Sequence, residues 1–456
     1  MTFLRGLLAG RSHLAFLVGL SAAIALARVT SGLGRGSPPT SRALGSLAQL
    51  SRALPLRAPE PPSDRERRLA LSAWSYLVRE TDPRTGLTRS IAGYPSITLW
   101  DFGSQLLAIL AAEDLGIVTP EESRRRLRHA IQTLAELPLC DPGLPNKAYH
   151  TATLAMVGYD NVPAPRGIGW SALDVGRALV PLALVVRRAP ELTPLVQRAV
   201  DRWDLDALSD GVALRGGTRG PGGILQTYQE GRLGYEQYAA RALMGWGVPV
   251  AEAIDFRAHL AFQKLDGQLV PRDDRLPRDY GGAHAAVLSE PWVLQGLEVG
   301  LDAVSLALAR SVLAAQERRF LSTGRLTAVS EDALDRPPGF VYSAVLNGTE
   351  AWVAFSPDGT PAPSHLTFST KAAFAWAALF AGDYPERLLA AAEELEAPGG
   401  GFWAGRYDAD GTPNRVLSLN TNAVVLEALA YRVRGPAFRS SPRGAAGVAV
   451  RAGAQQ

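Results

Sequence analysis

The chain has 456 residues, 47% of them hydrophobic and 20% charged; such proportions are typical of a globular protein and exclude disorder throughout. Its length allows two to three average domains or one large repetitive domain. The formal net charge of +3 is unevenly spread, because the first 57 residues contain seven arginines and no acidic residue. The remainder has 40 basic and 44 acidic residues, so it lacks the positive surface that binding to a nucleic-acid backbone requires.

The cysteine and histidine content argues against thiolate and metal chemistry. The single cysteine, Cys140, excludes an internal disulfide framework and a zinc site built on several thiolates. The six histidines are scattered without the spacing of metal ligands, and no nucleophile elbow, P-loop or dinucleotide fingerprint is present. We therefore expect neither a metal nor a cofactor.

The N-terminal segment predicts export. Arg5 and Arg11 precede an apolar run at residues 14–27 that ends in Ala-Leu-Ala, a pattern typical of a secretory signal. The run is shorter than the ~20 residues that span a bilayer comfortably. An uncleaved membrane anchor and an organellar transit peptide are the alternatives. We expect the protein to be periplasmic or secreted, or else anchored to the inner membrane.

Composition divides the chain into four parts. Residues 1–28 form the signal peptide or membrane anchor, and residues 29–63, rich in Pro, Ser, Gly and Arg, are predicted to be a linker. Residues 64–436 are predicted to form one folded domain with Asp64 capping its first helix. Residues 437–456 are predicted to be a disordered tail.

Apolar residues at three- and four-residue spacing predict a succession of helices. We place them at residues 64–77, 120–137, 171–188, 192–203, 229–246, 287–297, 302–320, 371–381, 385–396 and 419–433. Strand patterns are scarce, and residues 340–346 and 352–355 are the best candidates for a hairpin. Paired helices without a fixed-period repeat predict an all-α fold, an α/α toroid with a few short β-hairpins.

Polar and aromatic residues gather at the predicted helix starts. In an α/α toroid the starts of the inner helices meet at one end, where amides, carboxylates and indoles together suit a sugar. We therefore expect an oligosaccharide or polysaccharide partner. The predicted substrate-binding residues are Trp100, Tyr149, Trp170, Arg232, Tyr235, Tyr280, Trp292, Trp403, Asn420 and Asn422.

Glycoside hydrolysis needs one neutral carboxylic acid and one ionised carboxylate. Glu236, flanked by Tyr235 and Tyr238, is the predicted general acid, because a dry aromatic surround raises a carboxyl pKa. An ion pair of Glu236 with Arg232 on a solvated face is the alternative. The candidates for the second carboxylate or a subsite anchor are Asp174, Asp101 and Glu230, followed by Asp279, Glu290 and Glu350.

Several segments, in order, resemble a bacterial family known only as domain of unknown function 3131. The resemblance covers roughly Leu69 to Gly435 and is carried by residues 97–104, 144–149, 169–177, 229–238, 420–422 and 425–427. That family is in turn distantly similar to a glucoamylase-like group with endo-β-1,2-glucanases and the processing domain of cyclic β-1,2-glucan synthases. The similarity implies an α/α toroid and catalytic roles for Asp174 and Glu236.

The leading hypothesis is an exported glycoside hydrolase or transglycosylase that acts on a bacterial glucan or exopolysaccharide. The rival hypothesis is a non-catalytic polysaccharide-binding or scaffold protein on a degenerate glycosidase fold. A purely structural helical solenoid is the third, and the sequence leaves the oligomeric state open.

Overall fold

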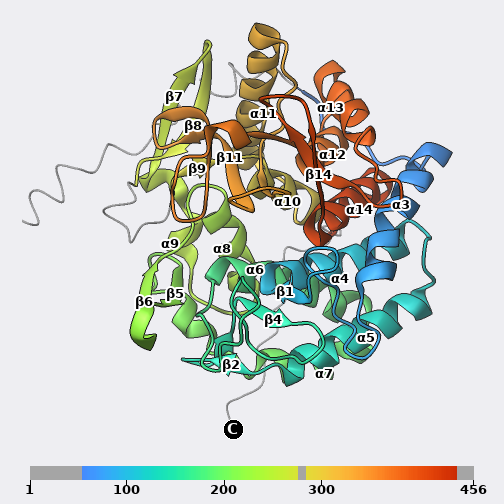
Figure 1. The fold of residues 1–456 in the computed structure, drawn as a ribbon, viewed down its shortest axis with the longest axis vertical. Helices are drawn as coiled ribbons and strands as arrows, with labels where there is room; N and C mark the ends of the chain where they lie inside the picture. The colour runs from blue at the N-terminus through green and yellow to red at the C-terminus, as the bar shows by residue number, and fades with distance from the viewer. Residues whose placement is uncertain (1–53, 276–283, 439–456) are drawn as a thin grey trace, which may run out of the picture.

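A computed structural model describes residues 54–275 and 284–438, and it contains a closed ring of six helices (Figure 1). Each inner helix contacts the next one along the ring, and the last helix closes onto the first. In ring order they are α4 (Leu99–Asp114), α6 (Ala172–Arg188), α8 (Tyr235–Gly245), α10 (Glu290–Glu298), α12 (Thr370–Leu379) and α14 (Leu419–Arg434).

A second set of helices surrounds this ring. The outer helices are α3 (Asp64–Glu80), α5 (Pro120–Glu136), α7 (Thr193–Val200), α9 (Ala251–Ile254), α11 (Ala303–Thr323) and α13 (Asp383–Glu393). Outer and inner helices alternate along the chain, so the six inner helices run in the same direction and their N-termini share one end of the ring. The predicted mostly helical fold is confirmed.

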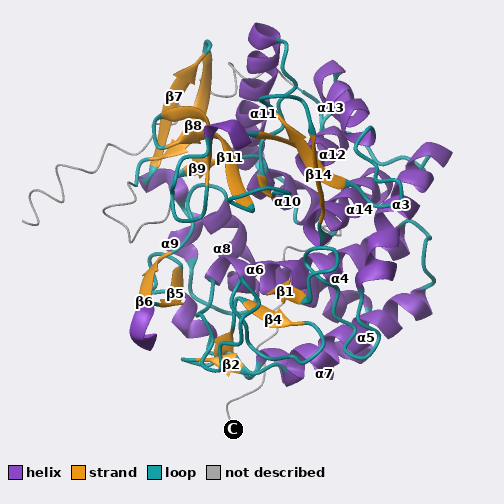
Figure 2. Cartoon of the chain, viewed as in Figure 1, coloured by secondary structure: helices purple, strands orange, loops and turns teal. Residues whose placement is uncertain are grey.

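Every described strand lies in a connection that leads from an outer helix to the next inner helix (Figure 2). Three two-stranded ladders pair β1 (Ser96–Thr98) with β4 (Ala148–His150), β5 (Arg215–Arg219) with β6 (Leu225–Gln229), and β7 (Leu260–Leu265) with β8 (Gln268–Asp273). A fourth pairs β2 (Leu139–Cys140) with β3 (Leu144–Pro145). One four-stranded sheet contains β9 (Ala286–Val287), β10 (Glu331–Ala333), β11 (Phe340–Asn347) and β12 (Glu350–Phe355). A three-stranded sheet contains β13 (Thr367–Ser369), β14 (Trp403–Tyr407) and β15 (Pro413–Leu417). The predicted hairpin is confirmed as β11 and β12, but the sequence pattern did not predict the other described strands.

Two predicted helix starts are wrong. Ser63, not Asp64, caps α3, because its hydroxyl accepts from Glu66 N while the Glu66 carboxylate accepts from Ser63 N. The helix expected from residue 229 begins only at Tyr235, because Gln229 ends strand β6. Gly231 and Gly234 follow with φ of +86° and +98°, which a helix cannot contain.

Glycines set the spacing between neighbouring inner helices. A Cβ at Gly103 on α4 would lie 2.6 Å from the Arg177 carbonyl oxygen, and one at Gly176 on α6 would lie 2.7 Å from Ala239 Cβ. Close backbone approach at these two crossings therefore needs residues without a side chain.

A buried ionic network joins the inner helices. Arg177 of α6 is fully buried, donates to Glu427 Oε1 of α14 at 2.9 Å and also pairs with Glu298 of α10. Tyr238 of α8 donates to Glu298 Oε2 at 2.7 Å, and Arg177 Nη2 donates to Ser104 Oγ of α4 at 3.3 Å. One guanidinium thus links five of the six inner helices.

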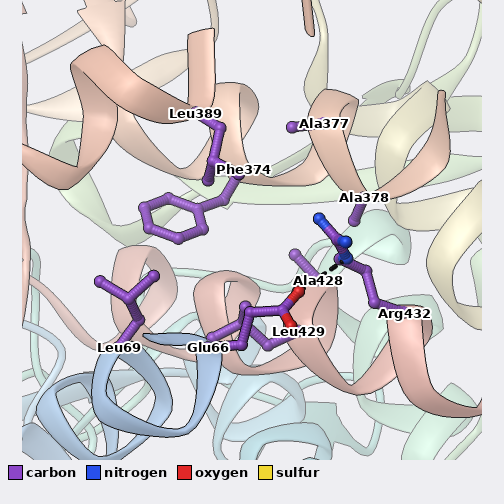
Figure 3. A pocket seen from close by; sticks show the side chains of 9 residues that line it. All are labelled: Glu66, Leu69, Phe374, Ala377, Ala378, Leu389, Ala428, Leu429 and Arg432. Carbon is purple, nitrogen blue, oxygen red and sulfur yellow. Dashed lines mark ion pairs between the residues drawn. The ribbon is translucent and has the colours of Figure 1, made fainter. Parts of the chain in front are cut away.

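The described part of the predicted linker packs on the domain. Arg57 N donates to the Leu379 carbonyl at 2.9 Å, and Glu60 N donates to the Arg432 carbonyl at 2.8 Å. Both partners stand at the C-terminal ends of inner helices, opposite the strands. A small cavity of about 10 Å³ lies at this end beside the Glu66–Arg432 ion pair (Figure 3), and its size admits one water.

The predictions for residues 1–53 and 439–456 fall outside the described residues. In the ranges that are described, no helix has the length and apolar character needed to cross a bilayer.

Candidate active site

Acidic residues and two lysines gather where the inner helices begin. We call this group the acid cluster. They come from the starts of four inner helices and from β10 and neighbouring loops, and their charges shift one another's pKa values. The members are Asp101, Lys147, Asp174, Glu230, Glu290, Glu331, Asp332 and Lys371.

One side of the acid cluster is built on the start of α6. The Ser171 hydroxyl accepts from Asp174 N at 3.1 Å, and Glu230 Oε2 accepts from Ala172 N at 2.6 Å. Burial and the Glu230 charge raise the pKa of Asp174 to about 7. Lys147 opposes both effects, and burial also raises the pKa of Glu230. Since Asp174 and Glu230 remain partly exposed, this acid pair can reach a ligand.

The other side is built on β10 and the starts of α10 and α12. Burial and the charge of Glu290 raise the pKa of Glu331 to about 8, against the opposing charge of Lys371. Lys371 forms an ion pair with Glu290, and both are buried, whereas Glu331 is partly exposed. Asp174 also raises the pKa of Glu331, which places the two partly exposed acids within electrostatic reach of each other.

Asp332 and Asp101 lie deeper than these acids. Asp332 is 3% exposed and accepts from the Thr367 and Ser369 hydroxyls, and burial raises its pKa to about 7. Asp101 accepts from the Thr98 hydroxyl at 2.8 Å, and burial raises its pKa as well. Both side chains therefore belong to the buried part of the acid cluster.

Tyrosines surround the exposed acids. Tyr228 Oη accepts from Lys147 Nζ at 3.1 Å, and Tyr342 lies opposite Glu331 in the β10–β11 ladder. Tyr159 is 64% exposed, yet desolvation of its hydroxyl and the charge of Asp174 raise its pKa, so its hydroxyl end reaches the acids. The Tyr235 hydroxyl lies beside Glu331. This hydroxyl is buried, and its interaction with Glu331 raises the pKa of Tyr235 and opposes the increase in the pKa of Glu331.

Glu236, the predicted general acid, lies in a buried ion pair. It is 2% exposed, and Arg275 Nη2 donates to Glu236 Oε2 at 2.6 Å. The other oxygen, Oε1, accepts from Leu214 N at 3.2 Å and Gln229 Nε2 at 3.1 Å. Burial raises the pKa of Glu236 and Arg275 opposes the increase. These contacts give Glu236 a structural position, and no Glu236–Arg232 ion pair is found among the described contacts.

Five predicted substrate-binding residues are buried in the domain, with side chains that contact protein. The Tyr149 hydroxyl donates to the Pro138 carbonyl at 2.8 Å, and Asn422 Oδ1 accepts from Phe402 N at 2.8 Å. The Trp170 ring packs directly on Gly217, where a Cβ would lie 2.4 Å away. All are at most 3% exposed: Tyr149, Trp170, Arg232, Trp292 and Asn422.

Other predicted residues lie nearer to the exposed acids. Trp100 packs edge-on against Tyr235 with ring centroids 5.8 Å apart, and Asn420 Nδ2 donates to Glu290 Oε1 at 2.8 Å. Trp403 on β14 is partly exposed, and the Cζ atom of the Arg415 guanidinium lies 5.5 Å from the centroid of its ring. Tyr280 and Asp279 lie outside the described residues, and Glu350 is exposed on β12.

The sequence missed Glu331 and Lys371. Glu331 precedes the predicted hairpin rather than a helix, so a search for polar residues at helix starts passes over it. A compositional signal was present, since the chain has only three lysines, Lys147, Lys264 and Lys371, among 47 basic residues, and two of them belong to the acid cluster.

Within residues 54–275 and 284–438, no group of three or more metal-ligating side chains could hold an ion.

Similar solved structures share the fold at low sequence identity. An endo-β-1,2-glucanase from Chitinophaga pinensis, in complex with sophorotriose and glucose, is 12% identical with a TM-score of 0.57, over 85% of this chain and 96% of that one. An endo-β-1,2-glucanase mutant from Talaromyces funiculosus, in complex with β-1,2-glucan, is 11% identical with a TM-score of 0.56, over 87% and 89%. A cellobiose 2-epimerase from Bacillus thermoamylovorans is 12% identical with a TM-score of 0.50, over 81% and 99%.

A search of curated proteins finds no match to this sequence. The model of a protein family of unknown function, DUF3131, matches residues 68–435. This range includes both rings of helices, apart from the first residues of α3, and every member of the acid cluster. The chain therefore belongs to the DUF3131 family.

Proposed function

We propose that this protein is an exported glycoside hydrolase or transglycosylase that acts on an uncharged polysaccharide such as a glucan. The observation that carries the proposal is the pair of partly exposed acids, Asp174 in the first turn of α6 and Glu331 on β10, which hold protons near neutral pH. The similarity of the fold to enzymes that act on β-1,2-glucan supports the same class of chemistry.

Glu331 suits the role of general acid. Its pKa of about 8 keeps it protonated at pH 7, and it is partly exposed. In hydrolysis Glu331 would give its proton to the glycosidic oxygen as the bond from that oxygen to the anomeric carbon breaks. Tyr235, whose buried hydroxyl lies beside Glu331, is placed to donate to the Glu331 carboxylate once the proton has left.

Asp174 suits the role of the second carboxylate. Once its proton is lost, it can take a proton from the water that attacks the anomeric carbon, or attack that carbon itself. Glu230 is held by the backbone at the start of α6, and its charge delays the ionisation of Asp174. In transglycosylation a sugar hydroxyl takes the place of the water.

The charge balance favours an uncharged substrate. Two lysines, Lys147 and Lys371, face the carboxylates of the acid cluster. Asp174, Asp332 and Glu331, with pKa values of about 7, 7 and 8, are substantially protonated at pH 7. The acid cluster has six carboxylates and only two lysines, so no surplus positive charge remains to attract an anionic polymer, and a neutral sugar needs no counter-charge.

The test is release of reducing ends from a glucan panel by residues 54–456, compared with D174N, E331Q and E236Q. We expect losses of about 100-fold or more for D174N and E331Q, because each removes a proton-transfer group. E394Q is the matched control, since Glu394 is exposed and pairs only with Arg406 among the described contacts.

The outcomes separate three assignments. Full activity in E331Q together with loss in E236Q would restore Glu236 as the general acid. Activity retained in D174N would remove Asp174 from the reaction. Binding of a glucan without turnover by the wild-type protein would favour the non-catalytic polysaccharide-binding protein.

A further inference from the structure

Glu290 is a carboxylate with no free oxygen. It begins α10 and is 1% exposed. Its Oε1 accepts from Asn420 Nδ2 at 2.8 Å, and its Oε2 accepts from Ser330 Oγ at 2.9 Å and pairs with Lys371 Nζ. A carboxylate held on both oxygens by three partners is fixed in place and charged, but it cannot reach a substrate.

Glu331 follows Ser330 directly in the chain, so the backbone that anchors Glu290 also positions the neighbouring acid. Groups on five other elements face Glu331. They are Glu290 from α10, Lys371 from α12, Asp174 from α6, and Tyr235 from α8, with Tyr342 opposite on β11. Asp332, next on β10, is held by the Thr367 and Ser369 hydroxyls on its own side.

The choice of lysine at this position is itself informative. Only three of the 47 basic residues are lysines, and Lys264 is exposed on β7, whereas Lys371 and Lys147 are 4% and 8% exposed. An ammonium is a compact point charge, while a guanidinium is larger and planar. The space between Glu290 and Glu331 therefore fits the smaller cation.

We propose that Glu290 and Lys371 are positioning residues: the Glu290 carboxylate, fixed by Lys371, Asn420 and Ser330, keeps a proton on Glu331. Lys371 limits the effect, so that Glu331 can still release the proton near neutral pH. The same design recurs on the other side, where Glu230, fixed on the start of α6 and facing Lys147, stands beside Asp174. The role of Glu331 as the acid rests on the proposed function.

The test is the pH dependence of kcat/KM in E290Q, which removes the charge and keeps the shape. We expect the alkaline limb to move to lower pH by about one to two units, the effect of a nearby unit charge in a partly buried site. In K371R, which keeps the charge but not the size, we expect lower activity at every pH. An unmoved alkaline limb in folded E290Q would overturn the proposal.

A second readout does not depend on turnover. The infrared difference spectrum between wild-type protein and E331Q isolates the protonated carboxyl band of Glu331, and its intensity against pH gives the midpoint. We expect a lower midpoint in E290Q and an intermediate one in the uncharged double variant E290Q/K371M, which also serves if E290Q does not fold. Equal midpoints in wild-type protein and E290Q would overturn the positioning role even if no substrate were found. Shifted midpoints in a protein that turns over no glycan would support the positioning role and contradict the proposed glycosidase function.

Discussion

The Arg177 guanidinium donates to Glu427 Oε1 at 2.9 Å, and this contact spans the interior of the ring between α6 and α14, joining two residues 250 positions apart in the chain. Both side chains are at most 2% exposed, and Glu298 completes the network from α10. Because Asp174 and Glu290 stand at the starts of α6 and α10, the network fixes the relative positions of the helices that carry these acids.

Replacing Arg177 with methionine should strongly destabilise the domain. The change leaves Glu298 and Glu427 buried without their cation, which typically costs about 3–5 kcal/mol. Urea unfolding followed by circular dichroism measures the loss. R125A is the control, because Arg125 pairs with Glu122 on an exposed helix face and should contribute about 0–1 kcal/mol. Equal losses in the two variants would contradict the role of the network.

If Asp174 and Glu331 act as proposed, the wild-type protein should have a narrow bell-shaped pH profile of kcat/KM. Below pH 7 Asp174, with a pKa of about 7, becomes protonated and can no longer act as the base. Above pH 8 Glu331, with a pKa of about 8, loses the proton it must donate. Activity on the best glucan should therefore peak between about pH 7 and 8, and a flat profile from pH 5 to 9 would contradict both assignments.

Stability should fall as the pH rises towards 8. Burial, with the neighbouring charge of Glu298, raises the pKa of Glu427 from its ordinary value of 4.5 to about 8 in the folded protein. A raised pKa stabilises the fold below the unfolded value, and this contribution is lost as the pH rises through the folded value. Melting temperatures of E427Q should consequently fall less between pH 5 and 8 than those of the wild type. A parallel decline in both proteins would show that Glu427 does not carry this dependence.

Two tyrosines of the predicted sugar site should respond differently to loss of the hydroxyl. Y235F should lower kcat/KM by about 10-fold with little change in melting temperature, because the hydroxyl interacts with Glu331, the proposed acid, and has no other hydrogen-bond partner among the described residues. Y149F should lower the free energy of unfolding by about 1–3 kcal/mol, because Asn146 N and the Pro138 carbonyl lose a buried partner. Activity per folded molecule should stay unchanged in Y149F, and the reverse pattern would move Tyr149 into the site.

Periodicity predicted most helices within a few residues, because their apolar faces and caps are local properties. The helix predicted at residues 287–297, for example, is α10 (Glu290–Glu298) in the structure. The start of α8 was missed, because a strand and two left-handed glycines interrupt a segment whose composition suits a helix. Short ladders such as β5–β6 depend on pairing between segments, which a local pattern does not record.

The site was predictable in kind and less so in detail. Asp174, Glu230 and Asp101 were named from their places at or before helix starts, and the structure brings all three into the acid cluster. Glu236 and Glu331 show the limit. Contacts between residues far apart in the sequence decide that Glu236 pairs with Arg275 and that Glu331 stays partly exposed. Tyrosines flank Glu236 in the chain, but in space Tyr235 and Tyr342 lie beside Glu331.

The packing of residues 54–60 determines how the domain faces its surroundings. These residues lie against the C-terminal ends of α12 and α14, at the far end of the ring from the acids. A surface that held the protein through the chain before Leu54 would therefore meet this end of the ring. The end that carries the acid cluster would point away from that surface.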